Sequence, residues 1–97
     1  MTPEDLLPGA ARPTLLRGVR RHWDKVRGTW VLLAPERALI LDEIGAAVLG
    51  ETDGKATFDE IVQRLAEKYA APPEQIAGDT RRFLVSLIQR RMAEARP

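Results

Sequence analysis

The chain has 97 residues, carries 15 basic and 14 acidic side chains for a net charge of +1, and is 44% hydrophobic. This composition fits one small globular domain, and the charge excludes the strong basic excess typical of nucleic-acid binders. With no cysteine and one histidine, His22, it cannot build thiolate, disulfide or multi-histidine metal chemistry. It has neither an apolar run of about 20 residues nor a signal-peptide pattern. We therefore expect a cytoplasmic binding module with no metal, cofactor or membrane contact, and not an enzyme.

Residues 1–18 are rich in residues that interrupt helices and strands: Pro3, Pro8, Gly9, Pro13 and Gly18. Such a density predicts a flexible N-terminal arm, whose leucines can pack on the domain or on a second copy. The domain itself is expected over residues 19–93, with a short tail at 94–97.

Residues 19–41 carry the pattern of three strands. Over 19–24 a two-residue period sets Val19, Arg21 and Trp23 against Arg20, His22 and Asp24, and the apolar, β-branched run 29–33 predicts a second strand. A third short strand is expected over 38–41. Because turns near Gly28 and Pro35 separate the three runs by only a few residues, the strands should form an antiparallel meander.

The pattern changes to helical from Asp42 onward. Asp42 is a candidate N-cap for a short helix whose apolar stripe includes Ile44 and which ends at Gly50. Thr57 and Glu60 have the spacing of a capping box and predict the start of a second helix.

A third helix is expected after the Pro72-Pro73 pair, since proline is tolerated in the first helical turn. Its apolar stripe consists of Ile76, Thr80, Phe83, Leu84, Leu87, Ile88 and Met92. The predicted fold is therefore α+β, with a three-stranded antiparallel sheet followed by three helices, in outline similar to a winged helix-turn-helix.

The third strand is the most informative candidate for function. It is an edge strand of the meander, yet Leu39, Ile40 and Leu41 carry none of the charges that normally protect an edge from pairing. One interpretation is that an extended peptide adds to this edge as a further strand. The other is that the N-terminal arm or a dimer partner covers it.

The last helix supplies a second candidate surface. Val85 lies about 100° from Leu84 on a helical wheel, at the border of the apolar stripe, and Arg82 and Gln89 flank it. An apolar side chain between long polar ones can line a groove, although a single half-exposed valine needs no explanation.

Strands followed by three helices, with arginines on the last, also suggest a winged-helix DNA-binding regulator. Glu74 and Asp79, however, make the first half of that helix acidic, where bases would be read. A solvated arginine face is the simpler interpretation. The chain offers no set of nucleophile, base and orienting group for catalysis.

Several short motifs, in order, resemble the PqqD family of pyrroloquinoline quinone biosynthesis. They are Leu32-Leu33-Ala34-Pro35-Glu36, Leu41-Asp42-Glu43-Ile44-Gly45-Ala46, Asp53-Gly54-Lys55-Ala56-Thr57 and Asp79-Thr80-Arg81-Arg82-Phe83-Leu84. Two departures stand out: Asp42 replaces the asparagine of the family, and Arg91-Met92 stands near the place of its closing Gly-Trp. The resemblance extends over residues 19–92.

The resemblance implies a RiPP recognition element, a domain that binds the leader of a ribosomally made precursor peptide. It implies a domain that binds PqqA and presents it to the radical S-adenosylmethionine enzyme PqqE. We also expect a monomer or weak homodimer that does not bind nucleic acid. In the family the peptide pairs with the third strand and lies against the last helix. The implied site therefore consists of Leu39, Ile40 and Leu41 on the strand, with Arg82, Val85 and Gln89 on the helix.

Overall fold

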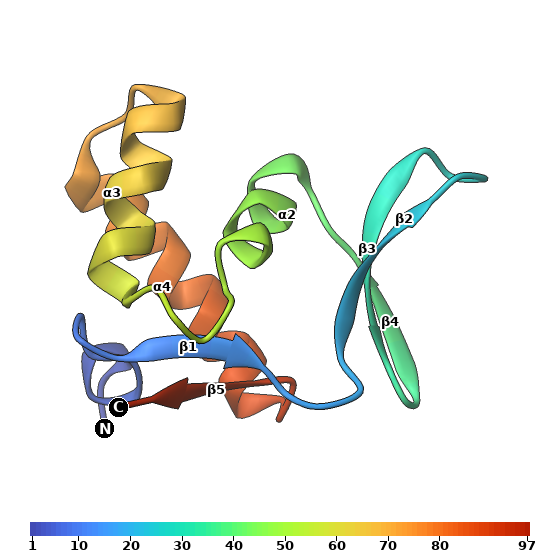
Figure 1. Cartoon of the computed structure of the whole chain (residues 1–97), viewed down its shortest axis with the longest axis horizontal. Helices are drawn as coiled ribbons and strands as arrows, with labels where there is room; N and C mark the ends of the chain where they lie inside the picture. The colour runs from blue at the N-terminus through green and yellow to red at the C-terminus, as the bar shows by residue number, and fades with distance from the viewer.

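The three predicted strands form one antiparallel sheet in the computed structural model, which describes residues 1–97. β2 (Arg20–Asp24), β3 (Thr29–Ala34) and β4 (Arg37–Ile40) are ordered β2-β3-β4, so β4 is an edge. Figure 1 shows this sheet standing to the right of the helices. The predicted meander is confirmed.

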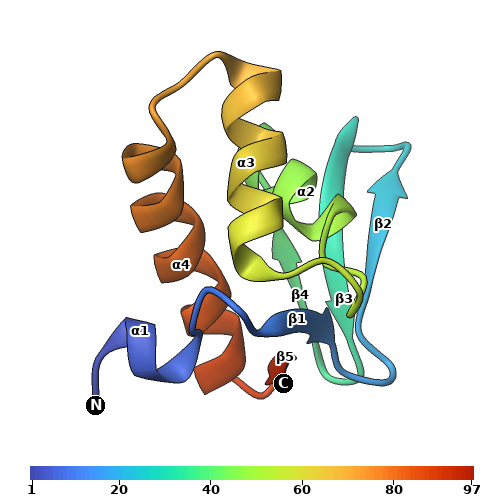
Figure 2. The same cartoon turned by 60° about the vertical axis from the view of Figure 1, so that its left-hand side comes forward.

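Three helices follow the sheet, as predicted, and confirm the α+β fold. They are α2 (Glu43–Gly50), α3 (Phe58–Tyr69) and α4 (Pro73–Gln89). Figure 2 shows α3 and α4 packed side by side, with α2 between α3 and the sheet. The core lies between these helices and the inner face of the sheet, where Leu32, Phe58 and Ile61 are at most 1% exposed.

Both predicted caps are present. The backbone N–H of Gly45 donates to Asp42 Oδ1 at 2.6 Å, which fixes the start of α2. At α3 the N–H of Glu60 donates to Thr57 Oγ1 at 3.1 Å, and the N–H of Thr57 donates back to Glu60 Oε1 at 2.8 Å. The hydrogen bond from the Thr57 backbone, followed by that from its side chain, lowers the pKa of Glu60.

Thr57→Ala is expected to lower the free energy of unfolding by about 1 kcal/mol, because it removes the hydroxyl that caps α3. Chemical denaturation at pH 7 measures this. In the parent protein, ionised Glu60 stabilises the folded state above its unfolded pKa of about 4.5. Since the folded pKa is lower, this contribution is lost as the pH falls through the folded value. An unchanged unfolding midpoint in Thr57→Ala would show that the capping box does not stabilise α3.

The expectation of a flexible arm and a free tail is wrong. Residues 1–18 contain α1 (Pro3–Leu6) and β1 (Arg12–Leu15), and β1 pairs antiparallel with β5 (Ala93–Arg96). Leu7 is fully buried, and the N–H of Phe58 donates to the Ala11 carbonyl at 2.8 Å. The prolines and glycines interrupt regular structure without preventing this packing, since β1 finds its partner strand at the other end of the chain.

Val85 is also placed differently from the sequence prediction. It is 6% exposed and belongs to the hydrophobic core together with Leu84 and Leu87. A helix that packs on several elements at once buries more than one stripe, so the border of the stripe read from the sequence lies inside the core.

Arg91 occupies an unusual backbone position at the end of α4. Its φ is +60°, and its N–H donates to the Ile88 carbonyl while that of Met92 donates to the Leu87 carbonyl. This is the Schellman motif, in which the left-handed residue is usually glycine. Ala70 ends α3 in the same way, with a φ of +50°.

Arg91→Gly and Ala70→Gly are each expected to raise the free energy of unfolding by about 0.5–1 kcal/mol. A non-glycine residue in the left-handed region costs about 1–2 kcal/mol, and part of the gain is offset by the larger unfolded-state entropy of glycine. Thermal denaturation of both variants checks this. A lower melting temperature in both would show that neither backbone is strained.

Candidate functional site

β4 presents an unpaired backbone edge. The N–H of Leu41 donates to the Trp30 carbonyl at 2.9 Å, so these residues form a hydrogen-bonded pair with β3. Because such pairs alternate with non-bonded ones along an antiparallel ladder, Leu39 also bonds to β3. The backbone N–H and C=O of Ala38 and Ile40 therefore face away from the sheet and are free to pair with another chain.

The side chains of β4 and of Leu41, which follows it, divide between the two faces of the sheet, as the sequence predicts. Leu41 is 5% exposed and Leu39 is half-buried, and both pack on the core side. Ile40 points to the other face and is 65% exposed. An additional strand on this edge would place its side chains alternately toward the helices and beside Ile40.

A cleft of about 250 Å³ lies between α2 and α4, next to the point where β4 runs into α2. Ile44 and Phe83 supply its apolar surface, and Asp42 and Asp79 line it with carboxylates. Ile44 was predicted to face the core, but it is 52% exposed. Sequence periodicity could not predict this exposure, because a helix of eight residues has too few turns to show which face is buried.

The helical wheel separates the residues of α4 that border this cleft from those that do not. Val85 lies about 160° from Phe83, on the opposite side of the helix. This is the side of Arg81, one turn earlier, which donates to the Leu7 carbonyl at 3.0 Å. Gln89 is exposed and lies about 120° from Phe83. Of the predicted helix residues, only Arg82 is linked to the cleft, through its ion pair with Asp79.

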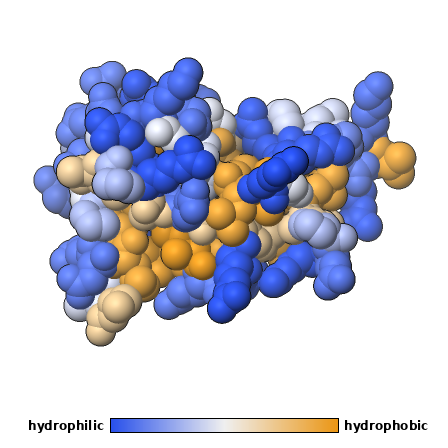
Figure 3. Space-filling model, turned by 60° about the horizontal axis from the view of Figure 1, so that its bottom comes forward, coloured by the Kyte–Doolittle hydropathy of each residue, from blue (hydrophilic) through white to orange (hydrophobic).

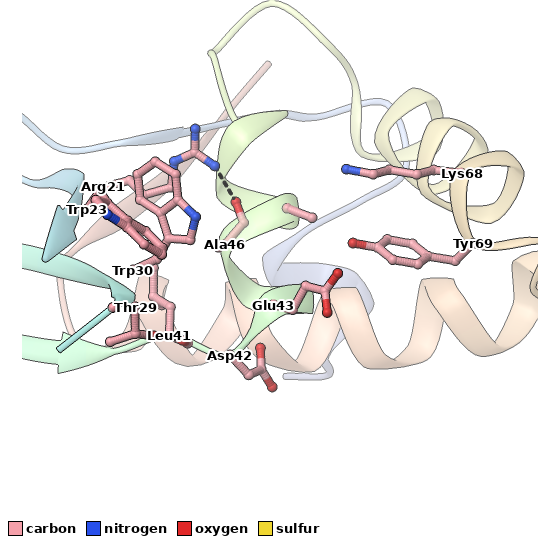
Figure 4. Close-up of a pocket in the computed structure, with 12 residues that line it drawn as sticks. Arg21, Trp23, Thr29, Trp30, Leu41, Asp42, Glu43, Ala46, Lys68 and Tyr69 are labelled. Atoms are coloured by element: carbon pink, nitrogen blue, oxygen red, sulfur yellow. Dashed lines mark hydrogen bonds between the residues drawn. The ribbon is translucent and has the colours of Figure 1, made fainter. Parts of the chain in front are cut away.

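A second hollow, of about 380 Å³, lies between α2, the β2–β3 hairpin and the end of α3. Figure 4 shows Trp23 and Trp30 on one side of it and Tyr69 on the other. The two indole rings meet edge to face at 5.4 Å. Arg21 stacks on Trp30 and donates to the Ala46 carbonyl at 2.8 Å, so the residues on this side anchor α2 to the sheet.

Neither hollow contains His22, which is exposed on β2. No group of three or more histidine, cysteine, aspartate or glutamate side chains is arranged to hold a metal ion. None of the helices has the length and apolar character needed to cross a membrane.

Comparison with known proteins places this geometry in a family. The family model described as Coenzyme PQQ synthesis protein D (PqqD) matches residues 29–93. A PqqA binding protein of Rhizobium meliloti is 47% identical over 89 residues, which cover 92% of this chain and 91% of the relative. The bifunctional coenzyme PQQ synthesis protein C/D of Methylorubrum extorquens is 44% identical, covering 89% of this chain but only 23% of that longer protein.

Two solved structures are similar. One is the solution structure of the PqqD truncation of Methylobacterium extorquens PqqCD, described as a functional, stand-alone RiPP recognition element. The two structures align with a TM-score of 0.80 and 42% identity, and the alignment covers 97% of this chain and 99% of that one. The other is the crystal structure of PqqD from Xanthomonas campestris, with a TM-score of 0.56, 38% identity, and coverage of 80% and 87%. The sequence motifs, the fold and the relatives agree, and the chain belongs to the PqqD family.

Proposed function

We propose that this protein is a non-catalytic adaptor that binds the precursor peptide PqqA and presents it to the radical S-adenosylmethionine enzyme PqqE. The observation that supports it most directly is the free edge of β4 beside the cleft between α2 and α4. The names of the relatives as PqqA binding proteins support the identity of the peptide.

In this proposal the peptide pairs with the backbone of Ala38 and Ile40 as a fourth strand. Its side chains alternate, so every second one points toward Ile44 and Phe83 in the cleft, and the others lie beside Ile40. Leu39 and Leu41 support the strand from the core side. On α4, Phe83 contacts the peptide in place of the buried Val85, and Gln89 does not contact it.

The cleft also favours a particular charge on the peptide. Asp42 and Asp79 both line it, and only Asp79 has an ion-pair partner, Arg82. Asp42 is engaged by one backbone N–H, that of Gly45. We therefore propose that a basic side chain of the peptide follows the apolar ones at this end of the groove.

Ile44→Asp tests the groove without damaging the fold. Ile44 is 52% exposed in the first turn of α2, where a carboxylate is compatible with the helix dipole. In the groove, the same carboxylate would face apolar peptide side chains and lose hydration without a partner. We expect at least a tenfold loss of affinity for PqqA peptide in calorimetric titration, with an unchanged thermal melt.

Val26→Asp is the matched control, because Val26 is 97% exposed in the turn between β2 and β3 and does not line the cleft. It should bind the peptide like the parent. Equal affinity of Ile44→Asp and Val26→Asp would remove the cleft from the binding site. Absence of peptide binding by the parent protein would refute the proposed function itself.

A further inference from the structure

A third hollow, of about 370 Å³, is lined by the connections β1–β2, β3–β4 and α4–β5. These connections lie along the lower edge of Figure 1. Its floor is apolar and is formed by Leu16, Val19, Ala34 and Met92. Figure 3 turns this side of the molecule toward the viewer and shows a hydrophobic band bordered by hydrophilic side chains.

Four arginines surround this floor, and we call the site the arginine hollow: Arg17, Arg37, Arg90 and Arg91. All four are exposed, and none takes part in the ion pairs of the protein. Arg37 donates to the Arg90 carbonyl at 3.4 Å, and Glu36 is the only acidic side chain of the lining. The hollow thus combines an apolar floor with a nearly uncompensated cationic rim.

Arg91 contributes a second, independent observation. It holds a left-handed backbone at a helix end, where glycine is favoured. Non-glycine residues kept in such conformations concentrate at sites of function. Here the retained side chain brings a fourth guanidinium to the hollow.

The arginine hollow shares no residue with the cleft between α2 and α4. On β4 the hollow includes only Arg37, whereas the proposed peptide pairs with Ala38 and Ile40, so the hollow leaves the cleft and these two residues free for the peptide. An adaptor requires this arrangement, because it has to hold a peptide and the enzyme that receives the peptide together.

We propose that the arginine hollow is a second docking site, which binds an acidic segment of the partner enzyme. An apolar side chain of that segment enters the hollow, and flanking carboxylates form forked hydrogen bonds with the guanidinium groups. The acidic character of the bound segment follows from the arginines of the hollow alone, whereas the identity of the partner as the enzyme rests on the function proposed above.

The probe is a synthetic hexapeptide of two leucines flanked by two glutamates at each end, titrated into the isotope-labelled full chain at low salt. We expect amide shifts at Arg17, Arg37 and Arg91 and none at Ile44. Arg91→Gly should weaken binding at least threefold, and Arg17→Gln with Arg91→Gly at least tenfold. Ala70→Gly relieves the same backbone conformation elsewhere and should leave the affinity unchanged.

The docking site would be overturned by shifts outside the hollow, by an equal effect of Ala70→Gly, or by equal binding of the hexapeptide with lysines in place of glutamates. Tighter binding of a short DNA duplex to the same arginines would also overturn it and indicate a phosphate site instead. Titration with PqqA peptide separates the two proposals. The Arg91→Gly variant should bind PqqA with the affinity of the parent. If the parent fails to bind PqqA, the proposed function is refuted, and the hexapeptide titration still tests whether the arginine hollow binds acidic segments.

Discussion

Ile40→Pro is expected to weaken binding of PqqA peptide at least tenfold while the protein stays folded. The N–H of Ile40 faces away from β3, so proline removes no hydrogen bond of the sheet, and edge strands accept proline in this orientation. The same substitution removes the donor that an added strand requires. A tenfold loss corresponds to about 1.4 kcal/mol, within the range expected for a hydrogen bond and the fit around it.

Leu39→Pro provides the opposite control one residue away. The N–H of Leu39 belongs to the ladder with β3, and its side chain packs on the core, so this variant should unfold at a much lower temperature. Calorimetric titration and thermal melts of both variants give the comparison. A folded Ile40→Pro protein with parental affinity would show that the peptide does not pair with β4.

Val85→Asp is expected to unfold the protein at room temperature or close to it. Val85 is 6% exposed within the core, and an unpaired carboxylate buried there costs several kcal/mol. The free energy of unfolding of a domain is about 5–15 kcal/mol in total. One such substitution therefore removes a large part of the stability. Circular dichroism during urea denaturation measures the loss.

Gln89→Asp, one turn further along α4, is the matched control because Gln89 is exposed. A carboxylate near the end of a helix should cost less than about 1 kcal/mol. If Val85→Asp instead unfolds at the parental urea concentration, Val85 is not part of the core and α4 has to be rotated relative to the sheet.

Local sequence patterns predict most of the helices and strands of this protein, because the interactions that define them lie within a few residues of one another. The capping box of Thr57 and Glu60 is complete within four residues, and the two-residue turn at Pro35 sets the register of β3 and β4. The apolar run Leu39–Leu41 at the sheet edge could be recognised for the same reason, since a two-residue period already assigns Leu39 and Ile40 to opposite faces. The four motifs of the PqqD family lie in or next to these same elements.

Long-range pairing could not be predicted in this way. β1 and β5 are separated by almost the whole chain, and each is only four residues long. Neither strand has an alternating pattern strong enough to stand out, so residues 1–18 and 94–97 were predicted to lie outside the domain. Burial of Leu7 and the bond from Leu16 N–H to the Met92 carbonyl join them to it.

The sequence by itself determined the α+β order, the caps, the open edge of β4 and the family. The tertiary structure alone decided which side chains border the groove and which fill the core. Ile44 and Val85 exchanged the roles predicted for them, since Ile44 is exposed and Val85 is buried. The physical reason is that helical periodicity defines where side chains point around one axis, whereas exposure depends on which neighbours pack against that axis.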